Sequence, residues 1–206
     1  DSTIIPVECI DEIADFAGVK DRVSAITERA MQGELDFDSA LRERVSLLEG
    51  LSVEALERTY AERISLNPGA EQLVAEMKRA GALTALVSGG FTYFTERVAA
   101  VTGFDRHQAN TLVIANGILT GEVGDPILGR EAKLIALQEL TAELGATPED
   151  AVAVGDGAND LAMIEAAGLG VAYHAKPAVA AKADARLDHS DLSAILYLQG
   201  LAALGF

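Results

Sequence analysis

Two loops that carry polar side chains and glycines each follow a short apolar run. Leu86-Val87 leads into Ser88-Gly89-Gly90 and then into a helix-like segment, which predicts a hydroxyl and free backbone N–H groups at a helix N-terminus. Such N–H groups have no helical partner, so this arrangement suits an anion such as phosphate. By itself the tripeptide fits an ordinary tight turn equally well.

The second loop carries two carboxylates four residues apart. The apolar run 151–154 leads into Gly155-Asp156-Gly157-Ala158-Asn159-Asp160. Carboxylate oxygens are ligands that Mg²⁺ prefers, although a turn residue and a helix-start residue would have the same side chains. In open parallel sheets ligands bind outside the carboxyl ends of the strands. We therefore expect both loops, with Lys133 from the intervening helix, to form one site for phosphate and Mg²⁺.

The chain opens on a third polar motif, Asp1-Ser2-Thr3, directly before Ile4-Ile5. Taken alone, it fits the N-cap of a helix. Beside the other two loops, it looks like the second half of an Asp-x-Asp-x-Thr motif at the end of a strand. Because no Met precedes Asp1, we expect further residues upstream of it.

The elements that position these motifs fall into two regions. Residues 6–67 show apolar side chains at helical spacing, which predicts a helical subdomain with its third helix near Asp38 and its fourth from Ser52. After Asn67-Pro68-Gly69, short apolar runs alternate with amphipathic helices, as in parallel βαβ units. Asn116-Gly117 predicts a tight hairpin turn. The predicted strands are 83–87, 111–115, 118–120, 151–154 and 169–172, the predicted helices are 70–80, 91–101, 130–144, 160–167 and 192–198, and 178–185 is predicted as a surface helix and turn.

Composition excludes several classes of protein. The 206 residues are 50% hydrophobic with only 5 Pro, which excludes a disordered or collagen-like chain. A net charge of −16 argues against a nucleic-acid partner, and no apolar stretch reaches the ~18 residues of a membrane span. The single cysteine, Cys9, cannot form an internal disulfide and reads as a small core residue. We expect a cytoplasmic protein with neither nucleic-acid nor membrane partners.

Together the three motifs and Lys133 resemble the haloacid dehalogenase superfamily, whose members use an aspartate nucleophile and Mg²⁺. Within it the chain resembles the phosphoserine phosphatase family over nearly its whole length, on the three motifs and on segments 8–14, 31–33, 41–45 and 87–91 together with Phe37. The resemblance implies an α/β fold: a doubly wound, mostly parallel Rossmann-like sheet with an inserted small helical cap. The core would comprise residues 1–5 and 68–206, and the cap residues 6–67.

The resemblance also implies roles in the core. Asp1 would be the general acid/base, with its backbone carbonyl on Mg²⁺. Asp156 would ligate the metal directly and Asp160 would support it. Ser88, Gly89, Gly90 and Lys133 would hold the phosphoryl oxygens and offset charge in the transition state, and Asn159 would contact phosphate or order the metal loop.

In the cap, the resemblance implies that Glu8 meets the ammonium group of the substrate and Arg44 its carboxylate. Met31 and Phe37 would cover the site. On sequence pattern alone, Glu8 and Arg44 would be solvated helix residues and Met31 and Phe37 packing residues.

The resemblance implies Mg²⁺-dependent hydrolysis of O-phospho-L-serine to L-serine and phosphate through an aspartyl phosphate, the last step of serine biosynthesis. The attacking aspartate of the family stands two residues before the acid/base aspartate, which places it ahead of Asp1, so we expect the 206 residues alone to bind without turning over. Two alternatives stay open. One is a phosphotransferase of the same fold that passes the phosphoryl group to an alcohol such as homoserine, and the other is a phosphate- and metal-binding module without the nucleophile.

Overall fold

The structure is a computed structural model that describes residues 1–31 and 34–201. Three apolar segments near the C-terminal end form a parallel sheet of β5 (Val152–Gly155), β6 (Leu169–Tyr173) and β7 (Ala185–Leu187). The first two strands are predicted by their apolar runs. The third is not, because the alanine-rich stretch before it has helical propensity. That stretch forms only the short helix α9 (Pro177–Ala180) before the chain turns into β7.

A second parallel pair joins β1 (Ala85–Phe91) to β2 (Arg106–Asn110). Strand β1 runs on through Ser88-Gly89-Gly90, which the sequence predicts as a loop beyond the strand. The register shifts between Val87 and Phe91, so these residues lie in an irregular part of the strand. The sequence misses β2 because three of its five residues are Arg, His and Gln, which show no apolar run.

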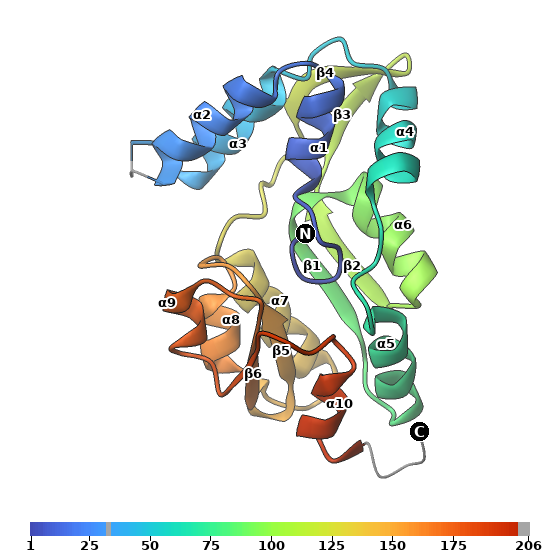
Figure 1. The fold of residues 1–206 in the computed structure, drawn as a ribbon, viewed down its shortest axis with the longest axis vertical. Coiled ribbons are helices and arrows are strands. Elements are labelled where there is room, and N and C mark those ends of the chain that lie inside the picture. Colours follow the sequence, from blue (N-terminus) through green and yellow to red (C-terminus); the bar gives the residue numbers. More distant parts are fainter. Residues whose placement is uncertain (32–33, 202–206) are drawn as a thin grey trace.

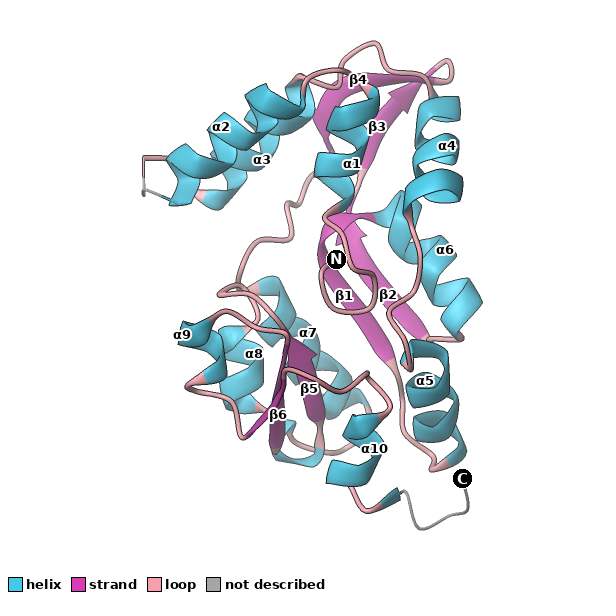
Figure 2. Cartoon of the chain, viewed as in Figure 1, coloured by secondary structure: helices cyan, strands magenta, loops and turns pink. Residues whose placement is uncertain are grey.

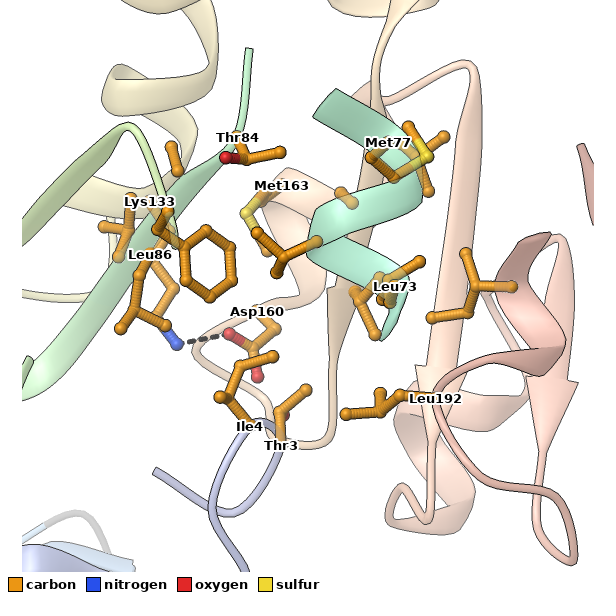
Figure 3. Close-up of a pocket in the computed structure, with 18 of the residues that line it drawn as sticks. Thr3, Ile4, Leu73, Met77, Thr84, Leu86, Lys133, Asp160, Met163 and Leu192 are labelled. Atoms are coloured by element: carbon orange, nitrogen blue, oxygen red, sulfur yellow. Dashed lines mark hydrogen bonds and ion pairs between the residues drawn. The ribbon is translucent and has the colours of Figure 1, made fainter. Parts of the chain in front are cut away.

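The facing edges of β1 and β5 are not hydrogen-bonded to each other within the described residues, so the single predicted sheet is present as two parallel sheets. An apolar slot lies between them, lined among others by Leu73, Leu86, Met163 and Leu192. Figure 3 shows these side chains around the slot, with Lys133 and Asp160 directed toward each other near Thr3 and Ile4. Because no backbone hydrogen bonds between strands of the described chain join the two sheets, they are connected by the packing of helices and of residues near Asp1.

Helices cover the strands in the order that βαβ units require. The core helices are α5 (Ala70–Arg79), α6 (Thr92–Thr102), α7 (Ala132–Glu143), α8 (Leu161–Ala166) and α10 (Ala194–Leu198), and a 3-10 turn spans Pro148–Asp150. Helix α6 packs on β1 and β2, whereas α8 packs on β5 and β6. Figure 1 shows α5 and α6 beside the first pair of strands and α7, α8 and α9 around the second sheet. All five predicted core helices are confirmed, with ends shifted by one or two residues.

The first third of the chain forms helices, as its apolar spacing predicts: α1 (Cys9–Phe16), α2 (Lys20–Met31), α3 (Phe37–Ser46) and α4 (Val53–Arg63). Helix α3 begins where Asp36 accepts a hydrogen bond from the backbone N–H of Ser39 at 2.7 Å. Such an N-cap satisfies one of the donors left free at a helix start.

A hairpin from later in the chain packs against these helices. Strands β3 (Leu112–Ala115) and β4 (Ile118–Val123) are joined by Asn116-Gly117, both with positive φ, which confirms the predicted tight turn. Leu119 N–H donates to the Leu51 carbonyl at 2.8 Å, and Val53 N–H donates to the Gly117 carbonyl at 2.9 Å. Figure 2 shows the hairpin among α1, α3 and α4. The helical region therefore packs as one unit with residues 112–123.

Two crossings of the chain connect the helical region to the core. Ile4 leads into the helices and Leu66 leads back, and both side chains pack against the two largest hydrophobic clusters. The Asn67 N–H donates to the Ile4 carbonyl at 2.8 Å, which ties the crossings together. Across the part of the chain described, no helix is both long and apolar enough for a membrane span.

Candidate active site

A cavity lies where the helical region meets the carboxyl ends of β1 and β5. Ten of the predicted site residues line it: Asp1, Glu8, Phe37, Arg44, Ser88, Gly89, Gly90, Lys133, Asp156 and Asn159. Ile10, Leu41 and Phe91 complete the lining with apolar surface. Residues up to 158 positions apart thus meet around one space.

The Ser88-Gly89-Gly90 segment is held in place by a hydrogen bond between two of its own residues. The Ser88 side chain is buried, and its Oγ accepts a hydrogen bond from the Gly90 N–H at 3.0 Å. A Cβ on Gly90 would lie 2.5 Å from Asp1 Oδ2 and 3.1 Å from Ser88 Oγ. A side chain at position 90 would therefore displace the Asp1 carboxylate from its place beside Ser88.

The Asp1 carboxylate is held from the other side by Cys9. The backbone N–H of Cys9 donates to Asp1 Oδ2 at 3.4 Å, and its thiol donates to Oδ1 at 3.2 Å. Burial raises the pKa of the Cys9 thiol to about 12, so the thiol keeps its proton and acts as a donor at neutral pH. Cys9 is the fully buried core residue that the sequence predicts, and it also orients the proposed acid/base.

The metal-binding half of the site centres on Asp156. Its Oδ1 accepts a hydrogen bond from the Thr3 hydroxyl at 2.9 Å. Burial raises the pKa of Asp156, and the charges of Asp160 and Glu8 act in the same direction, whereas the bond from Thr3 opposes them. A desolvated carboxylate of this kind is one that a cation stabilises in its charged form.

Asp160 organises the loop around Asp156. Its Oδ2 accepts hydrogen bonds from the backbone N–H groups of Asp156 and Gly157 at 3.1 and 3.0 Å, and its Oδ1 forms an ion pair with the Lys133 ammonium. Both oxygens are therefore engaged. This contact pattern fits the supporting role predicted for Asp160.

The residues present fit Mg²⁺, which typically takes one or two carboxylates and completes its shell with water and substrate phosphate. Asp156 and Asp1 line the same cavity, and the hydrogen bond from Thr3 takes only one oxygen of Asp156. Across residues 1–31 and 34–201 no group of three or more His, Cys, Asp or Glu side chains is arranged to hold a metal by itself. An open site that shares its ion with the substrate needs no such group.

Lys133 links the two halves of the site. It lies in the first turn of α7, lines the cavity, and pairs with Asp160, with the two side chains only 13% and 4% exposed. The sequence predicts contact of Lys133 with phosphoryl oxygens. The structure pairs its ammonium with Asp160 and places the side chain in the lining of the cavity that Ser88 also lines.

The helical region contributes a pair of opposite charges. Arg44 is half-buried, and burial lowers its pKa while Asp11 and Glu8 oppose the shift, so the guanidinium stays protonated. It donates to the Ala40 carbonyl at 3.2 Å, and among the described residues it forms no ion pair. A half-buried guanidinium with donors to spare is suited to receive a carboxylate.

Glu8 lines the same cavity, one helical turn before Asp11. Its carboxylate accepts a short hydrogen bond from the Ser2 hydroxyl, which holds it beside the Asp1-Ser2-Thr3 motif. Ser2 adopts a left-handed backbone with φ of 55°. The Asp1-Ser2-Thr3 motif therefore holds the Glu8 side chain and also supplies Asp1 to the cavity.

The Phe37 ring lies beside the Ser88-Gly89-Gly90 segment and lines the cavity. A Cβ on Gly89 would lie 3.5 Å from Phe37 Cζ, which places the ring in van der Waals range of the loop. Met31, the other predicted cover, is the last residue of α2, and its side chain lies outside the described part of the structure.

Four residues that support the site are not among the predicted site residues. Thr3 and Cys9 adjoin predicted ones, and their roles follow from contacts across the fold. Asn67 and Asn110 lie far from every motif in sequence, yet their side chains bond the Thr3 carbonyl and the Gly89 carbonyl. No sequence spacing signals these two, because each acts through a backbone carbonyl of a distant segment.

Comparisons with known proteins show the family of this chain. Residues 1–165 match the family model of haloacid dehalogenase-like hydrolases. A phosphoserine phosphatase of Albidiferax ferrireducens is 49% identical over 96% of this chain and 86% of its own length. A substrate-bound phosphoserine phosphatase structure is 43% identical with a TM-score of 0.88, covering 96% of this chain and 94% of that one.

A haloacid dehalogenase family hydrolase structure from Salmonella enterica shares 37% identity with a TM-score of 0.91, over 96% of this chain and 68% of that one. These likenesses extend across both the helical region and the core. The chain belongs to the phosphoserine phosphatase family of haloacid dehalogenase-like hydrolases.

Proposed function

We propose that the protein hydrolyses O-phospho-L-serine to L-serine and phosphate with Mg²⁺, the final step of serine biosynthesis, in the cytoplasm. One observation carries the proposal: Glu8 and Arg44 line the same cavity as Ser88, Lys133 and Asp156. The first pair matches the ammonium and carboxylate of an amino acid. The other three match a phosphate ester and its cation.

The phosphoryl group binds at the end of β1. The Ser88 hydroxyl, the Gly89 N–H and Lys133 hold its oxygens and offset the charge that develops in the transition state, and Gly90 lines the same part of the cavity. Asn159 contacts the phosphate or orders the metal loop. Mg²⁺, when bound by Asp156 and the Asp1 carbonyl, neutralises phosphate charge at the reacting centre.

Asp1 moves the proton. Its carboxylic acid protonates the serine oxygen as that oxygen leaves, and the resulting carboxylate then takes a proton from the attacking water. The phosphoryl group is carried meanwhile as an aspartyl phosphate, on the aspartate that the family pattern places two residues before Asp1. Cys9 keeps the Asp1 carboxyl oriented through both steps.

The helical region selects the substrate and covers it. Arg44 pairs with the substrate carboxylate and Glu8 with its ammonium group, while Phe37 shields the phosphate loop from bulk water. A chain of net charge −16 repels an anionic substrate at long range, so the cavity must supply positive charge locally. Arg44, Lys133 and the bound cation supply positive charge where the anion binds.

The decisive measurement is phosphate release from O-phospho-L-serine, with and without Mg²⁺. It compares the 206-residue chain with the encoded chain extended upstream to include the aspartate two residues before Asp1. We expect Mg²⁺-dependent release by the extended chain. No release by that chain, folded and with the aspartate present, would overturn the proposal.

Product analysis with homoserine as a competing acceptor tests hydrolysis against transfer. We expect phosphate as the product even when homoserine is in excess. Phosphohomoserine as the main product would identify a phosphotransferase and contradict the hydrolase assignment.

A further inference from the structure

Two asparagine side chains outside the cavity hold the two halves of the site. From their contacts we infer that Asn67 is a positioning residue for the metal half and Asn110 a positioning residue for the phosphate half. The inference rests on the proposed function for the identity of the ligands. Neither asparagine lines the cavity, so each must act through the segment that it bonds.

Asn67 lies where the chain returns from the helical region to the core. Its Nδ2 donates to the Thr3 carbonyl at 2.7 Å, and its backbone N–H donates to the Ile4 carbonyl at 2.8 Å. Two adjacent carbonyls of the segment that follows Asp1 are thus held by one residue. The peptide that carries the Thr3 side chain therefore has little freedom to rotate.

This restraint reaches Asp156 through one further bond. The Thr3 hydroxyl donates to Asp156 Oδ1 at 2.9 Å, so the direction of the Thr3 side chain sets the direction of the carboxylate. Without the Asn67 amide, the Thr3 carbonyl loses its partner and the peptide can turn. We expect Asp156 then to spend less time in the orientation that a cation requires.

The segment around Asn67 is itself fixed to the core. Gly69 has φ of +81°, and a Cβ there would lie 2.5 Å from the Ser193 backbone nitrogen. Leu192 N–H donates to the Pro68 carbonyl at 3.1 Å. Asn67 is therefore anchored before it touches Thr3, which a positioning residue must be.

Asn110, at the end of β2, also holds backbone groups of segments that are distant in the sequence. It is 1% exposed, and its amide makes bonds with two segments. Nδ2 donates to the Gly89 carbonyl at 2.9 Å and to the Leu128 carbonyl at 3.3 Å, while Oδ1 accepts from the Leu128 N–H at 2.7 Å. One buried side chain thus joins the phosphate loop to the segment that leads into α7.

Both joined segments supply phosphate ligands. Asn110 holds the carbonyl of the peptide that joins Gly89 to Gly90, and the N–H of that peptide donates to Ser88 Oγ at 3.0 Å, so the bond from Asn110 also restrains the Ser88 hydroxyl. Lys133 follows Leu128 by five residues, in the first turn of α7. Asn110 therefore sets the distance between the backbone donors and the ammonium that hold one phosphoryl group.

The test crosses two variants with two ligands. Binding of Mg²⁺ and of inorganic phosphate is measured by calorimetry on the protein, on Asn67→Ala and on Asn110→Ala. We expect Asn67→Ala to weaken Mg²⁺ binding about tenfold and phosphate binding little, and Asn110→Ala to do the reverse, since one lost bond is worth roughly that factor. These readouts need no turnover, so failure of the proposed catalytic function would leave them interpretable.

Thr102→Val is the matched control, because it deletes a buried hydroxyl bonded only to the Val98 and Ala99 carbonyls within α6. It should lower the melting temperature without changing either affinity. A general loss of stability would lower the affinity for both Mg²⁺ and phosphate in both asparagine variants, and that outcome would overturn the inference. Unchanged affinities in the two variants would overturn it as well.

Discussion

The Lys133 ammonium and the Asp160 carboxylate form a buried ion pair that joins the helix after the hairpin to the loop after β5. The other carboxylate oxygen of Asp160 accepts hydrogen bonds from two backbone N–H groups of the same loop. The pair therefore ties a phosphate ligand to the architecture of the metal loop. It is a structural element and part of the site at once.

Removal of Lys133 should consequently damage stability and activity together. Lys133→Ala leaves Asp160 charged and unpaired in the interior, at a cost of about 3–5 kcal/mol in the free energy of unfolding. Urea denaturation measures that cost. Lys182→Ala is the control, since its ion pair with Glu165 is exposed and worth at most about 1 kcal/mol. An equal loss in the free energy of unfolding in both variants would show that the Lys133 ion pair contributes no more to stability than the exposed one.

Arg44→Ala should impair a substrate that has a carboxylate far more than one that lacks it. In the chain extended upstream to the aspartate two residues before Asp1, we expect kcat/KM for phosphoserine to fall about 10- to 100-fold, which is the factor that one charged hydrogen bond contributes, and kcat/KM for phosphoethanolamine to change little. Arg42→Ala on the same helix is the control, because Arg42 pairs with Asp125 at the surface. A similar loss on both substrates would remove Arg44 from carboxylate recognition.

In the same upstream-extended chain, Gly90→Ala should abolish turnover while leaving the fold intact. The added methyl group would lie 2.5 Å from Asp1 Oδ2, so the carboxylate must leave its position. Gly124→Ala, whose Cβ would meet Thr111 at 3.4 Å, offers a comparison outside the cavity and should retain activity. Steady-state rates and circular dichroism distinguish loss of catalysis from loss of structure. An active Gly90→Ala enzyme would show that Asp1 need not sit against this loop.

The Cys9 thiol should resist labelling at neutral pH. Its pKa, raised to about 12 by burial, keeps it protonated, and the thiolate is the reactive form. We expect negligible reaction with DTNB in the native protein and stoichiometric reaction in denaturant. Rapid labelling of the native protein would mean that α1 opens or that the thiol is not held against Asp1.

Asp105 should give the protein a measurable sensitivity to acid. Its carboxylate accepts bonds from Lys78 and from the Thr84 N–H and hydroxyl, which lower its pKa from 3.8 to about 2. A pKa lowered by folding stabilises the native state above the unfolded value, and this stabilisation disappears as the pH falls from about 4 to 2.

Asp105→Asn should therefore be less stable than the parent by about 1–2 kcal/mol at pH 7. The difference should shrink as the pH approaches 2. Urea denaturation at a series of pH values measures it. A gap independent of pH would assign the loss to packing rather than to charge.

Local pattern was enough to predict most elements of this fold. Helical periodicity placed α5, α6 and α7 within two residues of their ends, and Asn116-Gly117 placed the hairpin turn, because both signals depend on neighbours in the chain. Sequence pattern does not predict strand β2, because Arg106, His107 and Gln108 form neither an apolar run nor a clear alternation of apolar and polar residues. Pairing with β1 makes it a strand, and that contact is not local.

The candidate site divides in the same way. The types and spacing of Asp1, Ser88, Asp156 and Asp160 were sufficient to predict phosphate and metal chemistry, because such loops carry their ligands within a few residues. The sequence by itself determined these ligands and the order of the elements that present them.

Only the tertiary structure decided how the ligands are held. Glu8 and Arg44 line one cavity with Ser88 and Asp156 because the helical region packs over the ends of β1 and β5. Asn67 and Asn110 become supports because distant carbonyls come within hydrogen-bonding distance. Such contacts depend on the three-dimensional path of the backbone, and a side chain that serves a remote carbonyl leaves no periodic trace in the sequence.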